Sequence, residues 1–253
     1  MRSATEPQSN FARLSAATDE STSSWFSFWS RPAKIHVGER HLRARYRVTV
    51  DRFLAAFPDT QGKRMLDYGC GEALDAGRLA AAGMDVLLYD RSEYFHRRLV
   101  PRFAGAKGVS VLDNASLGSL PAASVDHLLV CSVIQYLDGN ELAALIRLAH
   151  ELLRPGGVLI LADIIPDSLE TLPDTLDFLA YSIRHRFLFS GLRTLFDMVM
   201  TNYRSHLREN DLARYNLAAL SAQLAEHGFV PSLAPRNIGI SRARKTLFAR
   251  KPA

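Results

Sequence analysis

The chain has 253 residues, a formal net charge of +5, 47% hydrophobic residues and two cysteines. This length suits one large domain, or a domain with an appendage, that buries its core without disulfides or metals. Two cysteines make no disulfide framework, and no apolar stretch reaches the roughly 18 residues that a membrane span needs. The totals therefore favour a cytoplasmic protein over a secreted or membrane-spanning one.

The positive charge is concentrated toward the end of the chain. From Tyr181 onward there are 12 Lys and Arg against 4 Asp and Glu, a net of +8, whereas the rest has 19 against 22, a net of −3. A basic segment of this kind fits an anionic substrate, lipid headgroups or RNA, and it equally fits a solvated basic face. The composition leaves these alternatives open.

The beginning of the chain is polar and is followed by aromatic residues. Residues 1–30 are rich in Ser, Thr and Ala, which predicts a disordered leader. Residues 31–60 are expected to form a lid and a helix, although the aromatic residues ahead of the helix could instead anchor the leader on the core. Within this range, apolar residues of 38–57 recur near one helical face, and Pro58 and Gly62 follow.

Short apolar runs then alternate with helical segments from residue 61 to residue 164. Strands are predicted at 64–68, 85–90, 108–113, 125–133 and 157–163, and helices at 72–83, 92–103 and 140–157, the second capped by Ser92 and the third with a Pro-Gly-Gly exit. This alternation favours an α/β fold with a parallel sheet covered by helices on both faces.

The pattern changes after Ile164. Residues 165–208 look helical and unusually aromatic, and they are expected to be an insertion that covers the substrate. Residues 209–253 would return to the core, with a helix capped by Asn210 or Asp211 and two closing strands at 229–239 and 245–251.

A glycine turn between two acids follows the first predicted strand. Gly69 and Gly71 let the backbone turn tightly and approach a ligand at the carboxyl end of the strand, where open parallel sheets bind ligands. Asp67 can hold backbone amides or, through water, an ammonium group. Asp90 ends the second strand and can accept hydrogen bonds from two ribose hydroxyls. Together they predict a nucleoside ligand.

The turn does not match the motifs that bind pyrophosphate. Leu74 stands where G-x-G-x-x-G has its third glycine, and G-x-x-x-x-G-K-[ST] is absent. An acid directly before the turn favours a ligand with a positive charge. A nicotinamide dehydrogenase is therefore the less favoured alternative.

The sequence around this turn resembles that of class I S-adenosylmethionine-dependent methyltransferases. "LDYGCGEA" resembles their first motif, L-D-x-G-C-G-x-G, with Ala73 at the third glycine, and "ELLRPGGVLILAD" is similar to a later motif. The stretch from Val111 to Leu137 resembles their third-strand acid and fourth strand. The resemblance spans about residues 60–165. It implies a Rossmann-like fold with a seven-stranded, mostly parallel sheet, and S-adenosylmethionine as cofactor.

The resemblance also implies where the cofactor lies. The implied contacts are Asp67, Tyr68, Gly69, Cys70 and Gly71 at the methionine part, Asp90 and Arg91 at the ribose, Asp113 and Asn114 at the adenine edge, and Cys131 and Ser132 beneath the sulfonium. No metal site is expected.

Methyl transfer from a sulfonium is an in-line displacement in which the protein supplies alignment and excludes water. A hydroxyl acceptor also needs a general base, for which the candidates are Tyr136, His185, Tyr181 and His36. Tyr136 follows the fourth strand, and Tyr181 and His185 lie one helical turn apart. Each has a structural alternative: Tyr136 could pack against the lid, and His185 could lie on an exposed basic face.

The expected function is methyl transfer to a small, hydrophobic or aromatic acceptor. Residues 177–200 would cover the acceptor, contact an anionic membrane surface, or form a dimer face, so monomer and homodimer both remain open. An RNA-directed methyltransferase and a non-catalytic S-adenosylmethionine-binding partner protein are the alternatives. Nucleic acid is disfavoured because the fourth strand ends in "VCSVIQY" and not in an Asn/Asp-Pro-Pro-Tyr motif, and because no RNA-binding module is recognisable.

Overall fold

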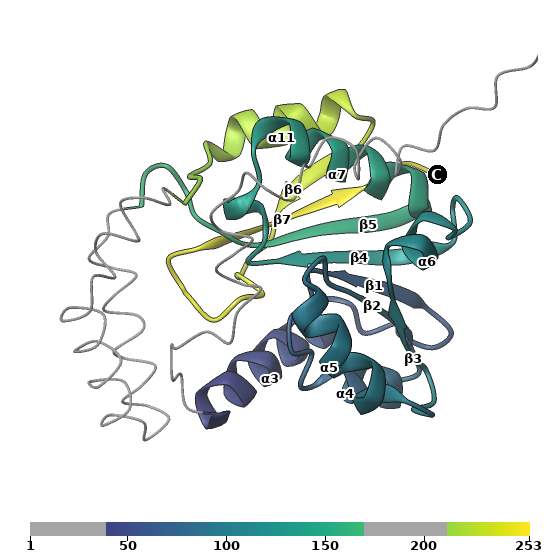
Figure 1. The fold of residues 1–253 in the computed structure, drawn as a ribbon. Helices are drawn as coiled ribbons and strands as arrows, with labels where there is room; N and C mark the ends of the chain where they lie inside the picture. The colour runs from purple at the N-terminus through teal and green to yellow at the C-terminus, as the bar shows by residue number, and fades with distance from the viewer. Residues whose placement is uncertain (1–38, 170–211) are drawn as a thin grey trace, which may run out of the picture.

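The structure is a computed structural model that describes residues 39–169 and 212–253 (Figure 1). The predicted leader at 1–30, the aromatic segment before residue 39 and nearly all of the predicted insertion at 165–208 lie outside the described residues. The membrane or dimer contact expected at 177–200 lies outside them as well.

Seven strands form one sheet in the order β3-β2-β1-β4-β5-β7-β6. They are β1 (Arg64–Tyr68), β2 (Asp85–Tyr89), β3 (Val109–Leu112), β4 (Val125–Cys131), β5 (Leu153–Ile164), β6 (Val230–Leu233) and β7 (Lys245–Arg250). Strands β1 to β5 pair in parallel, and β7 runs antiparallel to both β5 and β6. The predicted seven-stranded, mostly parallel, Rossmann-like sheet is confirmed.

Helices cover both faces of this sheet (Figure 1). They are α3 (Glu39–Ala56), α4 (Ala76–Ala81), α5 (Glu93–Phe103), α6 (Asn114–Gly118), the short 3-10 helix η1 (Ile134–Tyr136), α7 (Gly139–Leu152) and α11 (Leu217–Glu226). The buried residues form two clusters, one with Ile146 and Leu224 from α7 and α11, the other with Phe53 and Leu79 from α3 and α4. None of the described helices is both long and apolar enough to cross a membrane.

Several predicted boundaries were wrong, including the ends of the strands predicted at 125–133 and 229–239, which stop at Cys131 and Leu233. Helix α4 begins at Ala76 instead of residue 72, because Ala73 has a φ of 44° and a left-handed residue cannot continue an α-helix. Strand β5 begins at Leu153, so the Arg-Pro-Gly-Gly segment belongs to the strand. Helix α11 begins at Leu217, capped by the Asn216 side chain and not by Asn210 or Asp211.

The strand order reverses between β1 and β4. One half of the sheet continues from β1 to β2 and β3, and the other continues from β4 to β5. In sheets of this kind, ligands bind beyond the carboxyl ends of the strands at the reversal point. This point lies near Asp67, the last residue but one of β1, and Ser132, which follows β4.

Candidate functional site

The turn after β1 consists largely of left-handed residues. Gly69, Gly71 and Ala73 have φ values of 79°, 57° and 44°. The N–H groups of Gly69 and Cys70 both donate to the carbonyl of Tyr89, at 2.7 and 3.1 Å, which ties the turn to β2. Ala73 thus adopts the backbone for which the related motif uses its third glycine.

Neither glycine of the turn has room for a side chain. A Cβ atom on Gly69 would lie 2.5 Å from Cγ2 of Val133, and one on Gly71 would lie 2.7 Å from the hydroxyl of Tyr46. The close approach of backbone and neighbours therefore explains both glycines, in addition to their φ values.

Tyr46 of α3 supports the turn from the outside. Its hydroxyl donates to the carbonyl of Cys70 at 3.1 Å and accepts from the N–H of Glu72 at 2.8 Å. Burial raises the pKa of Tyr46 well above its usual value, so the hydroxyl keeps its proton and both hydrogen bonds. The sequence placed Tyr46 only on the apolar face of a helix, and no motif indicated this contact.

Asp90 organises the same turn. Its Oδ2 accepts from the N–H of Gly71 at 2.9 Å, and its Oδ1 accepts from the N–H of Ser92 at 2.8 Å. Burial raises the pKa of Asp90, while these two hydrogen bonds oppose the shift. Ser92 is the N-cap residue of α5, as predicted, but its hydroxyl makes no capping hydrogen bond.

Asp67 differs from Asp90 in having no hydrogen-bond or ion-pair partner among the described residues. It is half-buried at the end of β1. Burial, together with the nearby charge of Asp90, raises the pKa of Asp67 to about 7. A carboxylate in this position would be stabilised by a cation.

The residues predicted at the ribose and adenine end follow β2 and β3. The ring of Tyr68 packs against that of Tyr89 at 5.0 Å between centroids, and the Tyr89 hydroxyl donates to Oδ1 of Asn114 at 2.8 Å. Asp113 is exposed and caps α6 by accepting from the N–H of Ser116 at 2.7 Å.

Arg91 and Cys70 lie beside these groups. Arg91 forms an ion pair with Glu141 of α7 at 3.3 Å. Cys70 is buried, and burial raises the pKa of its thiol well above the usual value, so it is not a reactive thiolate.

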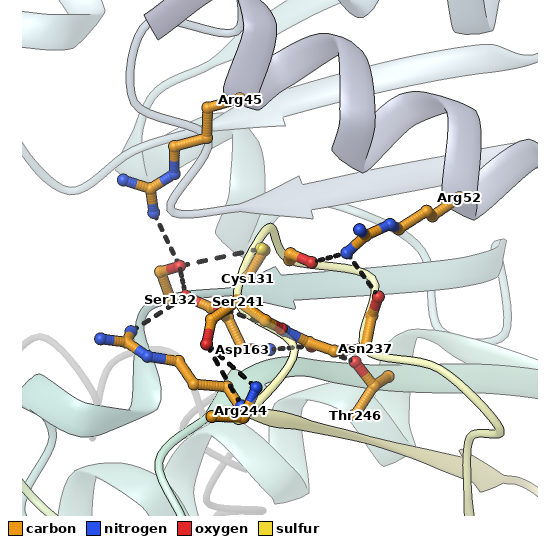
Figure 2. A network of polar contacts seen from close by, with 11 residues as sticks. Arg45, Arg52, Cys131, Ser132, Asp163, Asn237, Ser241, Arg244 and Thr246 are labelled. Carbon is orange, nitrogen blue, oxygen red and sulfur yellow. Dashed lines mark hydrogen bonds and ion pairs between the residues drawn. The ribbon is translucent and has the colours of Figure 1, made fainter. Parts of the chain in front are cut away.

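A second polar network lies at the carboxyl ends of β4 and β5 (Figure 2). The hydroxyl of Ser132 donates to Oδ2 of Asp163 at 2.7 Å and accepts from Arg45 of α3 at 2.8 Å. Ser132 and Asp163 have φ values of 59° and 63°, which is unusual for residues other than glycine. Two strained residues therefore stand side by side at the ends of neighbouring strands.

Asp163 is the centre of this network. Arg244 forms an ion pair with it at 3.0 Å, and the side-chain amide of Asn237 donates to its Oδ1 at 3.0 Å. The side-chain Oδ1 of Asn237 accepts in return from the backbone N–H of Asp163 at 3.1 Å and from the Thr246 hydroxyl at 2.8 Å. Although burial acts to raise the pKa of Asp163, Arg244 and Arg45 hold it below its usual value, so the group is a carboxylate.

The network was not predicted as a whole. Ser132 was expected beneath the sulfonium with Cys131, but Arg45 and Asp163 were not identified. Asp163 ends an apolar strand just as Asp90 does, and that signal could have found it. Cys131 is half-buried, and burial raises the pKa of its thiol to about 12.

The predicted catalytic residues are only partly described. Tyr136 ends η1, is half-buried and lies close enough to Arg45 to interact with its charge. His36, Tyr181 and His185 lie outside the described residues. In residues 39–169 and 212–253, no group of three or more His, Cys, Asp or Glu side chains is arranged to hold a metal ion.

One protein-family model matches the part of the chain that contains this site. The model of a family described as "Methyltransferase domain" matches residues 66–161, which include the glycine turn, Asp90 and Ser132. No curated protein matches the chain.

Several solved structures share the fold. Magnesium protoporphyrin IX methyltransferase from Synechocystis, solved with bound S-adenosylmethionine, is 17% identical with a TM-score of 0.55, over 98% of this chain and 100% of that one. A 1,6-didemethyltoxoflavin-N1-methyltransferase from Burkholderia thailandensis is 15% identical with a TM-score of 0.56, over 100% and 94% of the two chains. A putative S-adenosylmethionine-dependent methyltransferase from Methanococcus maripaludis is 11% identical with a TM-score of 0.56, over 100% and 98%.

At these identities the likeness shows the fold, and the family match adds the motif residues. The glycine turn, the strand order and the family match agree: residues 66–161 match a methyltransferase domain, and the sheet has the class I S-adenosylmethionine-dependent methyltransferase fold.

Proposed function

We propose that the chain binds S-adenosylmethionine beyond the ends of β1 and β2 and methylates a small, hydrophobic or aromatic acceptor beyond β4 and β5. The observation that carries this proposal is Asp67, a half-buried acid with a raised pKa and no partner among the described residues, directly before a turn of left-handed backbone. A cationic ligand would stabilise this acid, whereas a pyrophosphate would be repelled by it.

Different side chains of the protein would contact different parts of such a ligand. Asp67 would face the ammonium group of the methionine part. Asp90 uses each carboxylate oxygen for one backbone N–H and keeps further lone pairs for ribose hydroxyls. Asp113 and Asn114, at the end of β3, are in place to contact the adenine edge.

The chemistry of the transfer resides in the sulfonium, whose methyl group is the reacting carbon. The protein has to align the acceptor in line with that carbon and exclude water. Tyr136 is the candidate base in the described part of the chain, and His36, Tyr181 and His185 remain predictions. A small acceptor is supported by the fold neighbours, since one was solved with bound 1,6-didemethyltoxoflavin.

Calorimetry tests the cofactor assignment. S-adenosylhomocysteine should bind the wild-type chain, NADH should not, and Asp67→Asn should weaken S-adenosylmethionine more than Asp113→Asn, which changes an exposed acid. Tighter binding of NADH would overturn the proposal. Transfer of a tritiated methyl group to a panel of small aromatic alcohols, amines and acids then tests turnover.

A further inference from the structure

Arg45 has more hydrogen-bonding capacity than the described protein uses. It is half-buried, and its single hydrogen bond within the described residues is to the uncharged hydroxyl of Ser132. It forms no ion pair with any described acid. Figure 2 shows its other terminal nitrogen directed away from the network. A guanidinium carries several N–H donors in a planar fork, so most of those of Arg45 remain available.

The nearest acid, Asp163, is shared between Arg45 and Arg244. Asp163 is already bonded to Arg244, Ser132 and Asn237, and it reaches Arg45 only through the Ser132 hydroxyl. Two guanidinium groups thus face one carboxylate among the described residues, and one positive charge is left for another anion.

The structure holds this arginine in place at some cost. Ser132 and Asp163 both have left-handed backbone conformations, which persist only where the surroundings enforce them and which cluster at functional sites. The Ser132 hydroxyl, fixed between Asp163 and Arg45, orients the guanidinium. Such fixed geometry suits recognition of a planar carboxylate by two parallel hydrogen bonds.

Two carboxylates could supply this anion, one on the methyl acceptor and one on the methionine part of the cofactor, and the position of Arg45 beyond β4 favours the acceptor. Ser132 and Asp163 follow β4 and β5, while Asp90 and Asp113, the residues proposed for ribose and adenine, follow β2 and β3 on the other side of the reversal point. Tyr136, the candidate base, lies near the same guanidinium.

We infer that Arg45, oriented by Ser132, binds a carboxylate of the methyl acceptor, so that the substrate is a carboxylated aromatic or lipophilic small molecule. The inference rests on the proposed function, because it assumes that the acceptor enters beyond β4 and β5.

Fluorine NMR titrations of the chain saturated with S-adenosylhomocysteine test this inference, using 4-fluorobenzoate and its neutral counterpart 4-fluorobenzamide as probes. Wild type should bind the benzoate about tenfold more tightly, the scale of a charge-assisted bidentate contact. Arg45→Met should remove that preference, and Arg45→Lys should keep part of it. Arg47→Met is the matched control, because Arg47 lies on the same helix, is 69% exposed and makes only a 4.0 Å ion pair with Asp75.

Three results would overturn the inference: no preference in wild type, a preference that survives Arg45→Met, or Arg45→Met weakening S-adenosylhomocysteine but not 5′-methylthioadenosine. The last would assign the arginine to the carboxylate of the cofactor. Unchanged binding of S-adenosylhomocysteine shows that a variant is folded. If wild type fails to bind S-adenosylhomocysteine, the proposed function itself is wrong; if it binds without a carboxylate preference, only this inference is.

Discussion

The same substitution at two glycines should have opposite effects on stability. Gly69 has a φ of 79°, and an added Cβ atom would lie 2.5 Å from Cγ2 of Val133. Gly77 lies in α4, and an added Cβ would meet nothing within 4 Å. Gly69→Ala should therefore destabilise the protein, while Gly77→Ala should stabilise it.

The magnitudes follow from separate contributions. An alanine in the left-handed region costs about 1–2 kcal/mol, and turning Val133 away from its preferred rotamer costs about 0.5–1.5 kcal/mol. The lower entropy of the unfolded chain returns about 0.4–1 kcal/mol. Gly69→Ala should thus lower the free energy of unfolding by about 2 kcal/mol, whereas Gly77→Ala should raise it by about 0.5–1 kcal/mol.

Equilibrium unfolding in urea measures both changes, and calorimetry measures the affinity for S-adenosylhomocysteine. Val133→Ala in a double-mutant cycle with Gly69→Ala should recover the side-chain part of the loss and leave the backbone part. If Gly69→Ala is as stable as wild type and binds the cofactor product equally well, the reasoning about this turn is refuted.

Four further predictions concern Asp67, His127 and Tyr46. Because the pKa of Asp67 is raised to about 7, the affinity for S-adenosylmethionine should fall as the pH drops through that value, and calorimetry across this range should show no such dependence in Asp67→Asn. The same shift means that the free energy of unfolding of the unliganded protein, taken relative to that of Asp67→Asn, falls as the pH rises from about 4 to about 7, so a flat difference between the two urea-unfolding profiles would contradict it. Burial lowers the pKa of His127, and its Nδ1 has no partner in the described part of the chain. The unfolded state therefore takes up a proton first, and the free energy of unfolding of wild type, taken relative to that of His127→Phe, should fall as the pH drops below about 6.5. Tyr46→Phe removes two hydrogen bonds from the turn and should cost about 1–3 kcal/mol in urea unfolding, with weaker cofactor binding; unchanged values for both would show that the turn does not need this support.

The sheet was predictable because its pattern is local. Each central strand is a short apolar run, and the alternation with helical segments favours parallel pairing. The residue at which α11 begins is not determined by the local sequence. Good capping residues stand at three positions, Asn210, Asp211 and Asn216. However, the backbone just before Leu217 pairs with a distant segment. The Tyr215 N–H donates to the carbonyl of Ile165 at 2.9 Å, and Tyr215 forms an isolated β-bridge with Pro166.

The same distinction applies to the site. Gly69, Gly71 and Asp90 fall within one strand–turn–helix–strand unit, so their spacing alone indicated a nucleoside site. The second network joins segments that are far apart in sequence, since Arg45 meets Ser132 across 87 residues and Asp163 meets Asn237 across 74. Such contacts depend on how helix α3 and the loop before β7 pack on the sheet, which residue patterns do not encode.

Helix α3 contacts both halves of the site through consecutive residues, Tyr46 at the glycine turn and Arg45 at Ser132, and Arg52 binds the carbonyls of Asn237 and Gly239. Because α3 is a single helix, a movement of it changes its contacts at the glycine turn and at Ser132 together. Sliding or rotating it would disturb both the glycine turn proposed for the cofactor and the arginine proposed for the acceptor. A protein engineer who redesigns this helix to accept another acceptor should therefore expect the affinity for S-adenosylmethionine to change as well.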